Sequence, residues 1–382
     1  MLCFLCKTIF SQAHREIAPI SISIQNQNLW FSVKCMSSTS NAQPFIVSYL
    51  INTCGFSPKK AASASKYLSF QTREKPDLKI EFFKKQGFSQ TQVLRMIRGA
   101  PRLLLFDTEK NVLPKIQFLK SKGILCSELP KIISSCPDIL RRSLEKQIIP
   151  SFDFFESLFQ SEVNFMKALK RCPQILVLCN TRIVPNIKVF REEGVSELLI
   201  VKLLERQPRA LTGSADRFKE IVAKVREMGF NPLTMKFMMA VAVLVCISKS
   251  TWTRKADLYK RLGWSDDDIL AAFEKNPQFV TISEDKIAKT MNFFVNEMGW
   301  ESSTLARYPV LLSLSLKKRI IPRASVIQVL LSKGLVKQLA LQQIFYSSEK
   351  VFLDKFIMCQ GNEADELLKL YQEKMDVDRK KL

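Results

Sequence analysis

Arg98-Gly-Ala-Pro101-Arg-Leu-Leu-Leu105 is a phrase that returns throughout the chain. Each copy joins a proline to an aliphatic residue three positions later, and the copies begin at Pro101, Pro137, Pro173, Pro208, Pro277 and Pro309. The prolines are 36, 36, 35, 69 and 32 residues apart, so the long interval is two periods with one proline missing. A self-similar unit of about 35 residues is typical of a stacked-repeat protein, in which each unit packs only on its neighbours.

Glycines mark the same period, at Gly55, Gly87, Gly123, Gly194, Gly229, Gly263, Gly299 and Gly334. The interval from Gly123 to Gly194 is two periods, so one marker is missing there. A glycine just past a helix end suits the left-handed backbone of a C-cap. Each glycine is therefore expected to end the first helix of a unit.

Each unit is predicted to contain two helices and a short irregular or 3₁₀ segment. After Pro101, apolar residues three and four apart favour a first helix over about 109–122 and a second over about 128–135. Ser127 is expected to cap the second helix, and Pro137 to stop it. No long alternating pattern indicates strands, so the expected fold class is all-α.

A second proline follows the first by twelve or thirteen residues in four units, at Pro114, Pro150, Pro185 and Pro322. It is expected early in the first helix, where its missing N–H costs least. The pattern allows either the first helical position or a kink.

The repeat array is expected to span residues 41–371 in about eight units, followed by a polar tail at 372–382. The fifth unit departs from the pattern near 235–263. Its stretch from Met238 to Cys246 has no proline and is apolar on all sides, which predicts the most buried helix of the array.

Residues 1–40 resemble an organellar transit peptide. They contain seven serines and three basic residues against one acid, Glu16. Basic, serine-rich and acid-poor N-termini are typical of transit sequences, and no small-residue cleavage site for secretion follows the apolar start closely.

The composition of the 382-residue chain favours a polyanionic partner. Its 58 Lys and Arg against 36 Asp and Glu give a net charge of +22, which first suggests nucleic acid and second an anionic membrane surface. The longest apolar run, 237–248, is too short to span a bilayer.

Few residues could support catalysis or a metal site. His14 is the single histidine, and Cys3 and Cys6 form an isolated CxxC pair without a second pair. Most of the ten cysteines, including Cys126, Cys136, Cys172 and Cys246, are interpreted as small buried apolar residues. The acids of Ser265-Asp-Asp-Asp268 fit the first turn of a helix better than a catalytic cluster. We therefore expect no enzyme, no metal and no cofactor.

The proline phrase, the second proline and the glycine turn resemble the repeats of the mTERF family, the mitochondrial transcription termination factors, and its plant branch in particular. The resemblance rests on the proline phrase, the second proline, Thr251-Trp-Thr-Arg-Lys255 with Leu262-Gly-Trp-Ser265, and the ending around Glu349-Lys-Val-Phe352. It covers about residues 45–371. It implies a right-handed α-solenoid of helix–helix–3₁₀ units with a basic concave groove, import into mitochondria or plastids, and roles in organellar transcription or RNA processing.

Basic residues recur at one position of the repeat. The residue nine positions after each repeat proline is Lys110, Lys146, Arg182, Arg217, Lys286 or Lys318, and this set is called the first basic column. In a solenoid, one position per repeat forms a continuous line, which can follow a phosphate backbone. The competing interpretation is a solvated outer face, or pairing with the adjacent Glu109, Glu145 and Asp285.

A second basic column lies two residues before the repeat prolines, at Arg171, Arg206, Lys275 and Arg307, with Arg98 one place earlier. Arg102 and Arg209 follow their prolines directly, and Arg141 and Arg142 form a pair. Because arginine can fork onto guanine or phosphate, these residues are the better candidates for reading sequence. Paired phenylalanines at helical spacing are expected in the core instead of stacking on bases.

The resulting prediction is a monomer that binds double-stranded DNA and regulates or terminates transcription, in the mitochondrion or alternatively in the chloroplast. No small-molecule substrate and no membrane insertion are expected. RNA binding for intron splicing or transcript maturation is the first alternative, and a protein scaffold whose basic face meets an acidic partner is the second. An RNA-reading repeat of the pentatricopeptide kind has a similar period, but it lacks the proline phrase and the glycine turn.

Overall fold

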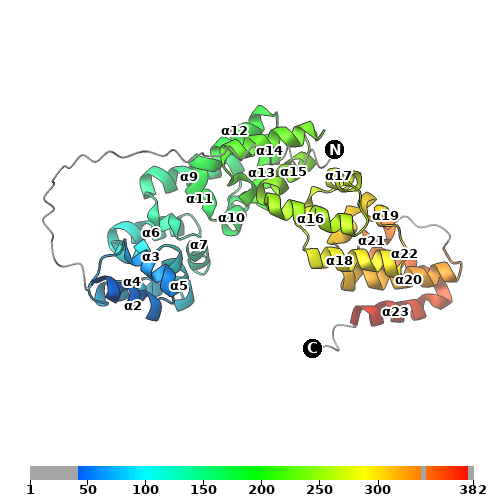
Figure 1. Ribbon diagram of the computed structural model, residues 1–382, viewed down its shortest axis with the longest axis horizontal. Helices are drawn as coiled ribbons and strands as arrows, with labels where there is room; N and C mark the ends of the chain where they lie inside the picture. The colour runs from blue at the N-terminus through cyan, green and yellow to red at the C-terminus, as the bar shows by residue number, and fades with distance from the viewer. Residues whose placement is uncertain (1–41, 337–340, 377–382) are drawn as a thin grey trace, which may run out of the picture. The chain divides into compact units, whose positions relative to one another are not determined.

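The predicted order of a long helix, a short helix and a brief helical segment is repeated along the computed structural model (Figure 1), which describes residues 42–336 and 341–376. All regular elements within these ranges are helical. The chain divides into two compact units, with the boundary between Cys246 and Ile247. The expected transit peptide, His14 and the CxxC pair lie outside the described residues.

The elements of the first compact unit are α2 (Ala42–Asn52), α3 (Pro58–Ser65), α4 (Glu74–Lys85), α5 (Gln90–Gly99), η1 (Pro101–Leu105), η2 (Thr108–Val112), α6 (Leu113–Ser121), α7 (Leu129–Ser135), α8 (Asp138–Arg141), η3 (Leu144–Ile148), α9 (Ile149–Phe159), α10 (Glu162–Arg171), α11 (Gln174–Leu178), η4 (Cys179–Ile183), α12 (Val184–Glu192), α13 (Glu197–Arg206), η5 (Pro208–Leu211), α14 (Ala215–Glu227) and α15 (Met235–Cys246).

The elements of the second compact unit are α16 (Lys249–Arg261), α17 (Asp266–Lys275), η6 (Pro277–Thr281), α18 (Glu284–Asn292), η7 (Phe293–Glu297), α19 (Ser302–Arg307), η8 (Pro309–Ser313), η9 (Leu316–Ile320), α20 (Ile321–Ser332), α21 (Leu341–Phe345), α22 (Glu349–Phe356), η10 (Met358–Glu363) and α23 (Ala364–Asp376). Helix α23 packs along α20 and continues into the expected polar tail.

The proline phrase forms the joint between units. It is a 3₁₀ helix in η1, η5, η6 and η8, as predicted, and a short α-helix in α8 and α11. The prediction that Ser127 caps the second helix is wrong. Ser127 lies in a turn, and Glu128 occupies the position before α7 without a side-chain cap. Pro130 in the first turn of α7 already reduces the number of N–H groups that need a partner.

The second proline is preceded by a π-helical turn in each of its four units. The turns η2, η3, η4 and η9 end two residues before Pro114, Pro150, Pro185 and Pro322. At η2 the N–H of Leu113 donates to the carbonyl of Thr108, five residues back. Helices α14, α16 and α18 have no proline at this position and begin without such a turn. A proline cannot donate the α-helical bond, so the first turn is widened instead.

All eight marker glycines have positive φ, which confirms that they end the first helices. The missing marker is Gln160, which has φ 48° and follows α9 directly. It is the one non-glycine residue with positive φ in the described part of the chain. The repeat geometry is therefore kept where its preferred residue is absent, at a cost of about 1 kcal/mol.

Helix α15 is largely buried, as its uniform apolarity predicted, with seven of its 12 residues in the core. Only Ile247 and Ser248 separate it from α16, so the joint segment is missing from this repeat. Within the described ranges, no single helix is long and apolar enough to cross a membrane. The segments α15 and α16 reach that length and composition only when taken together across a sharp break.

Cysteine and phenylalanine positions largely follow the predicted core. Cys136 and Cys172 are buried, but Cys126 and Cys246 are exposed, so the prediction is wrong for these two residues. Of the phenylalanine pairs, Phe83, Phe155, Phe293 and Phe294 are buried, and Phe82 and Phe154 are partly exposed. Cysteine gives a weak burial signal near helix ends, because small residues there can face solvent.

Candidate nucleic-acid interface

The first basic column lies at the start of the first helix in six of the repeats. Lys110, Lys146, Arg182 and Lys318 are in the π-helical turns, and Arg217 and Lys286 are in the first turns of α14 and α18. Four members belong to the first compact unit and two to the second. Lys110, Lys146, Arg217 and Lys318 are exposed, and Arg182 and Lys286 are partly exposed.

Most members of this column keep their charged groups available. The side chains of Lys110, Lys146, Arg182 and Lys318 make no hydrogen bond or ion pair with any described residue. Lys110 and Lys146 do not pair with Glu109 or Glu145 in the described part of the chain, and Asp285 pairs with Lys289 at 2.9 Å. The Asp107 carboxylate, whose pKa is lowered first by its hydrogen bond from the Lys110 N–H, is also attracted to the Lys110 charge, but no ion pair forms between the two side chains. Cations are disfavoured at a helix N-terminus, so their recurrence there without ion pairs favours an external anion.

Lys286 differs from the rest of the column. Its Nζ donates a hydrogen bond of 2.5 Å to the carbonyl of Ser313, at the end of the next joint. This contact shows that the start of a first helix lies beside the joint of the following repeat. It also makes Lys286 partly structural.

An open groove of about 630 Å³ gathers three of the predicted site residues. Lys110 comes from the start of one first helix, and Arg141 and Arg142 follow the joint of the next repeat. Arg141 is held by Asp138 at 2.7 Å, whereas the guanidinium of Arg142 has no partner among the described residues. The structure thus brings the first basic column and the arginine pair together, although they are about 30 residues apart in sequence.

Two residues of the second basic column donate hydrogen bonds to the helix end that precedes the next joint. Arg171 donates from Nη1 to the carbonyls of Glu205 and Arg206 at 2.5 and 3.4 Å, which caps the end of α13 in the next repeat. Lys275 donates in the same way to the carbonyl of Arg307 at 3.3 Å. A cation at a helix C-terminus is favoured by the unpaired carbonyls and the dipole there. The guanidinium groups of Arg206 and Arg307 have no side-chain partner in the described ranges.

The arginines directly after the prolines also have intramolecular contacts. The Arg102 guanidinium lies 5.1 Å from the centre of the Tyr67 ring. Burial raises the pKa of the Cys172 thiol, and the nearby guanidinium of Arg209 opposes this shift. Both arginines remain exposed, so these contacts leave part of each head group accessible.

Sequence reasoning missed a column of buried polar residues directly after the second proline or at the equivalent position, consisting of Lys115, Ser151, Asn186, Lys255, Thr290 and Arg323. Four of them donate to carbonyls near the end of the next joint. The Lys115 Nζ donates to the carbonyl of Leu140 at 2.8 Å, and the Asn186 Nδ2 donates to the carbonyls of Leu211 at 2.9 Å and Gly213 at 3.0 Å. The Lys255 Nζ donates to the carbonyls of Val280 and Ile282 at 2.5 Å each, and the Arg323 Nη1 donates to that of Ile344 at 2.7 Å. The signal was present in the sequence as a polar residue on the apolar face of six first helices.

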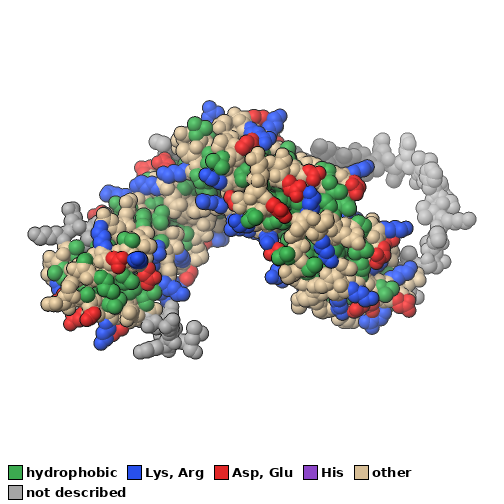
Figure 2. Space-filling view, turned by 180° about the vertical axis from the view of Figure 1, so that it is seen from behind, with side chains coloured by type: hydrophobic (Ala, Val, Ile, Leu, Met, Phe, Trp, Pro, Cys, Tyr) green, Lys and Arg blue, Asp and Glu red, His purple; other side chains and the backbone are tan. Residues whose placement is uncertain are grey.

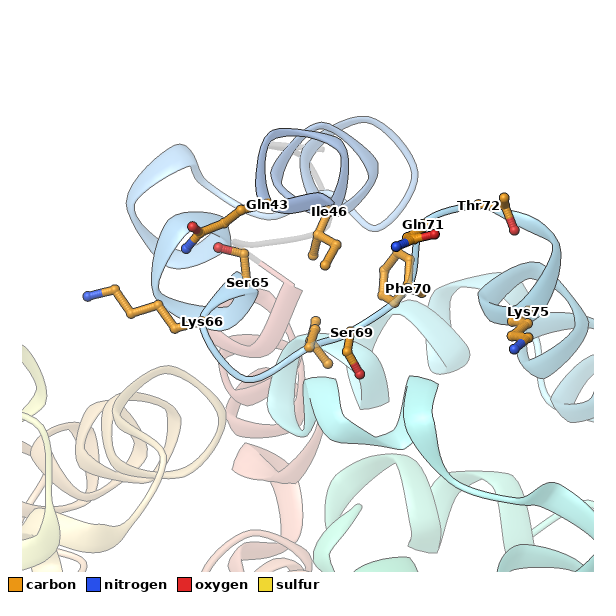
Figure 3. Close-up of a pocket in the computed structure, with 10 residues that line it drawn as sticks. Gln43, Ile46, Ser65, Lys66, Ser69, Phe70, Gln71, Thr72 and Lys75 are labelled. Carbon is orange, nitrogen blue, oxygen red and sulfur yellow. The ribbon is translucent and has the colours of Figure 1, made fainter. Parts of the chain in front are cut away.

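Another concavity, of about 600 Å³, lies in the first repeat (Figure 3), where Lys66 and Lys75 are among the lining residues. No acidic side chain is among the described residues that line it. The first repeat lacks the proline phrase, so this cavity adds positive charge without extending either basic column. On the face shown in Figure 2, Lys and Arg side chains are spread over both compact units, with Asp and Glu among them.

The fold and this surface define an all-α helical-repeat protein with cations at the starts of its first helices. The mTERF family model matches residues 80–290 and 231–353, and the chain belongs to this family. The chain is also 30% identical over 105 residues to "Transcription termination factor MTERF15, mitochondrial" of Arabidopsis thaliana. That alignment covers 27% of this chain and 24% of the relative, so the chain matches only about a quarter of that protein's length.

The name of this relative is that of a mitochondrial transcription termination factor. Among the described residues, no group of three or more His, Cys, Asp or Glu side chains is arranged to hold a metal ion.

Proposed function

We propose that this protein binds double-stranded DNA through the first basic column and thereby regulates or terminates transcription in an organelle. The observation that carries the proposal is the recurrence of Lys110, Lys146, Arg182 and Lys318 at equivalent positions without partners among the described residues. Such cations neutralise phosphates and release counterions, which makes binding strongly dependent on salt. The sequence neither requires a cofactor nor supports a catalytic role.

The test compares the wild-type protein with the variant Lys146→Ala/Arg182→Ala in fluorescence-polarisation titrations. Labelled duplex DNA and single-stranded RNA are titrated over a series of salt concentrations. We expect the variant to bind the duplex more weakly. The slope of the logarithm of the binding constant against the logarithm of salt concentration should become shallower by about two, one for each lost phosphate contact. Arg95→Ala/Lys131→Ala is the matched control, because it removes two exposed cations from second helices, α5 and α7.

The alternatives predict different results in the same titrations. Tighter binding of RNA than of the duplex, with the same dependence on Lys146 and Arg182, would assign the column to transcript processing. An affinity for an acidic protein with no measurable nucleic-acid binding would favour the scaffold. Equal effects of the site variant and the control variant would show that the first basic column faces away from the ligand.

The proposed compartment is the mitochondrion, with the chloroplast as the alternative. The support is the serine-rich, basic composition of residues 1–40 and the mitochondrial label in the name of the Arabidopsis relative. Fusion of residues 1–60 to a fluorescent protein tests it, because the fusion should enter mitochondria. Import into plastids, or retention in the cytosol, would contradict the proposal.

A further inference from the structure

The joint beside Lys110 carries an arginine pair at two positions where the other joints carry no charge. Arg141 and Arg142 occupy the fourth and fifth positions after Pro137. The same two positions hold Leu105 and Phe106, Val177 and Leu178, Thr212 and Gly213, Thr281 and Ile282, and Ser313 and Leu314 elsewhere in the array. Thus a cation of the first basic column meets an arginine pair at one joint only among these repeats.

The walls of this groove come from two successive repeats. Lys110 and Asn111 belong to η2, and Arg142 and Ser143 precede η3. Lys115 joins the two walls, because its Nζ donates to the carbonyl of Asn111 at 2.7 Å and to that of Leu140 at 2.8 Å. The backbone segments that carry Lys110 and Arg142 are therefore held together by the buried side chain of Lys115.

The same contacts make the groove suited to an anion. Lys115 donates hydrogen bonds to two carbonyl oxygens, which reduces their repulsion of a bound anion. Its ammonium also adds a third cation beside Lys110 and Arg142. Burial lowers the pKa of Lys115, and a bound anion beside it would oppose this shift. Glu145 is the one acidic residue among those that line the groove, and it pairs with no described cation.

We propose that this groove binds a single phosphodiester of the nucleic-acid backbone, held between Lys110 and the guanidinium of Arg142. An arginine fork and a lysine that approach from two repeats can contact different oxygens of one phosphate. This fixes the register of the nucleic acid along the array, because the other joints lack the arginine pair at the fourth and fifth positions after the proline. The inference rests on the proposed nucleic-acid binding and names its anchoring point.

The test measures binding of a labelled duplex of about 20 base pairs by wild type, by Lys110→Ala/Arg142→Ala and by Arg95→Ala/Lys131→Ala over a salt series. We expect the groove variant to bind on the order of tenfold more weakly at low salt. The slope of the logarithm of its binding constant against the logarithm of salt concentration should become shallower by about one, because one phosphate contact is lost. The control variant has the same net charge as the groove variant, and its affinity and salt dependence should equal those of the wild type. Helix content measured by circular dichroism should be unchanged in all three proteins.

A second pair of variants separates geometry from charge. Arg142→Lys keeps the charge but loses the fork, so it should recover only part of the affinity, whereas Arg142→Glu should weaken binding further than Arg142→Ala. Equal affinities for Arg142→Lys, Arg142→Ala and wild type would overturn the proposal.

Two further outcomes keep this inference distinct from the proposed function. If the wild type binds the duplex but the groove variant matches the control, the anchoring site is refuted, and the proposed function then rests on Lys146, Arg182 and Lys318. If the wild type binds no nucleic acid, both are refuted. Saturable binding of inorganic phosphate that depends on Lys110 and Arg142, without any effect of these residues on duplex affinity, would assign the groove to a free anion and overturn the proposal.

Discussion

Replacement of Lys255 by methionine should destabilise the residues that follow α16. The Lys255 side chain is 7% exposed, and its Nζ donates to the carbonyls of Val280 and Ile282 at 2.5 Å each. These carbonyls lie at the end of the next joint, so the contact ties one repeat to the following one. Methionine preserves most of the apolar stem and removes only the donor.

The expected magnitude follows from the two lost bonds. Hydrogen bonds from a charged group contribute about 1.5–3 kcal/mol each, and two carbonyls lose their donor in a buried site. Removal of a desolvated ammonium recovers part of this cost. We expect a net loss of about 2 kcal/mol in the free energy of unfolding. The matched control is Lys289→Met, which removes an exposed i,i+4 ion pair with Asp285 and should cost less than about 0.5 kcal/mol.

Urea unfolding followed by tryptophan fluorescence measures this difference, because Trp252, Trp264 and Trp300 all lie in the second compact unit. The slope of free energy against urea should be the same for both variants, so that the midpoints report stability. A loss for Lys255→Met no larger than that for Lys289→Met would refute the reasoning that the buried polar column couples neighbouring repeats.

Three further predictions concern stability. Burial lowers the folded-state pKa of Lys255, so the unfolded chain keeps its proton to higher pH than the folded chain. The stability of wild type relative to Lys255→Met should therefore rise as pH increases toward the ordinary lysine pKa, measured by unfolding at each pH. Gln160→Gly should stabilise the protein by about 0.5–1 kcal/mol, because glycine adopts positive φ without strain, and an unchanged or lower melting temperature would contradict this. Arg171→Ala should lower the free energy of unfolding by about 0.5–1 kcal/mol and speed amide exchange at the end of α13. Faster exchange in α10 alone would argue against a capping role.

The repeat register was predictable from the sequence because its markers obey local rules. A proline beyond the first turn cannot continue a helix, and a glycine after a helix favours positive φ, so the phrase at Pro101 and the marker glycines placed the joints and turns in order. The burial of α15 followed from its composition alone. Local rules failed at Ser127, where the turn before α7 left no free donor at the expected cap.

The roles of the basic residues could not be separated by the same means. Both basic columns have the same charge and the same period, but Arg171 and Lys275 contact carbonyls of the next repeat and Lys146 and Arg182 do not. The difference depends on which surfaces successive repeats bury against each other. The binding role of every residue in these columns stays a prediction.

The sequence by itself determined the class of fold, the period of the array and the family, because each repeat carries its own start and stop signals within about 35 residues. Only the tertiary structure decided which polar side chains serve the joints and that Lys110 meets Arg142 in one groove. The reason is that these contacts join residues in successive repeats, and their partners are backbone carbonyls, which every residue possesses and which no sequence pattern distinguishes.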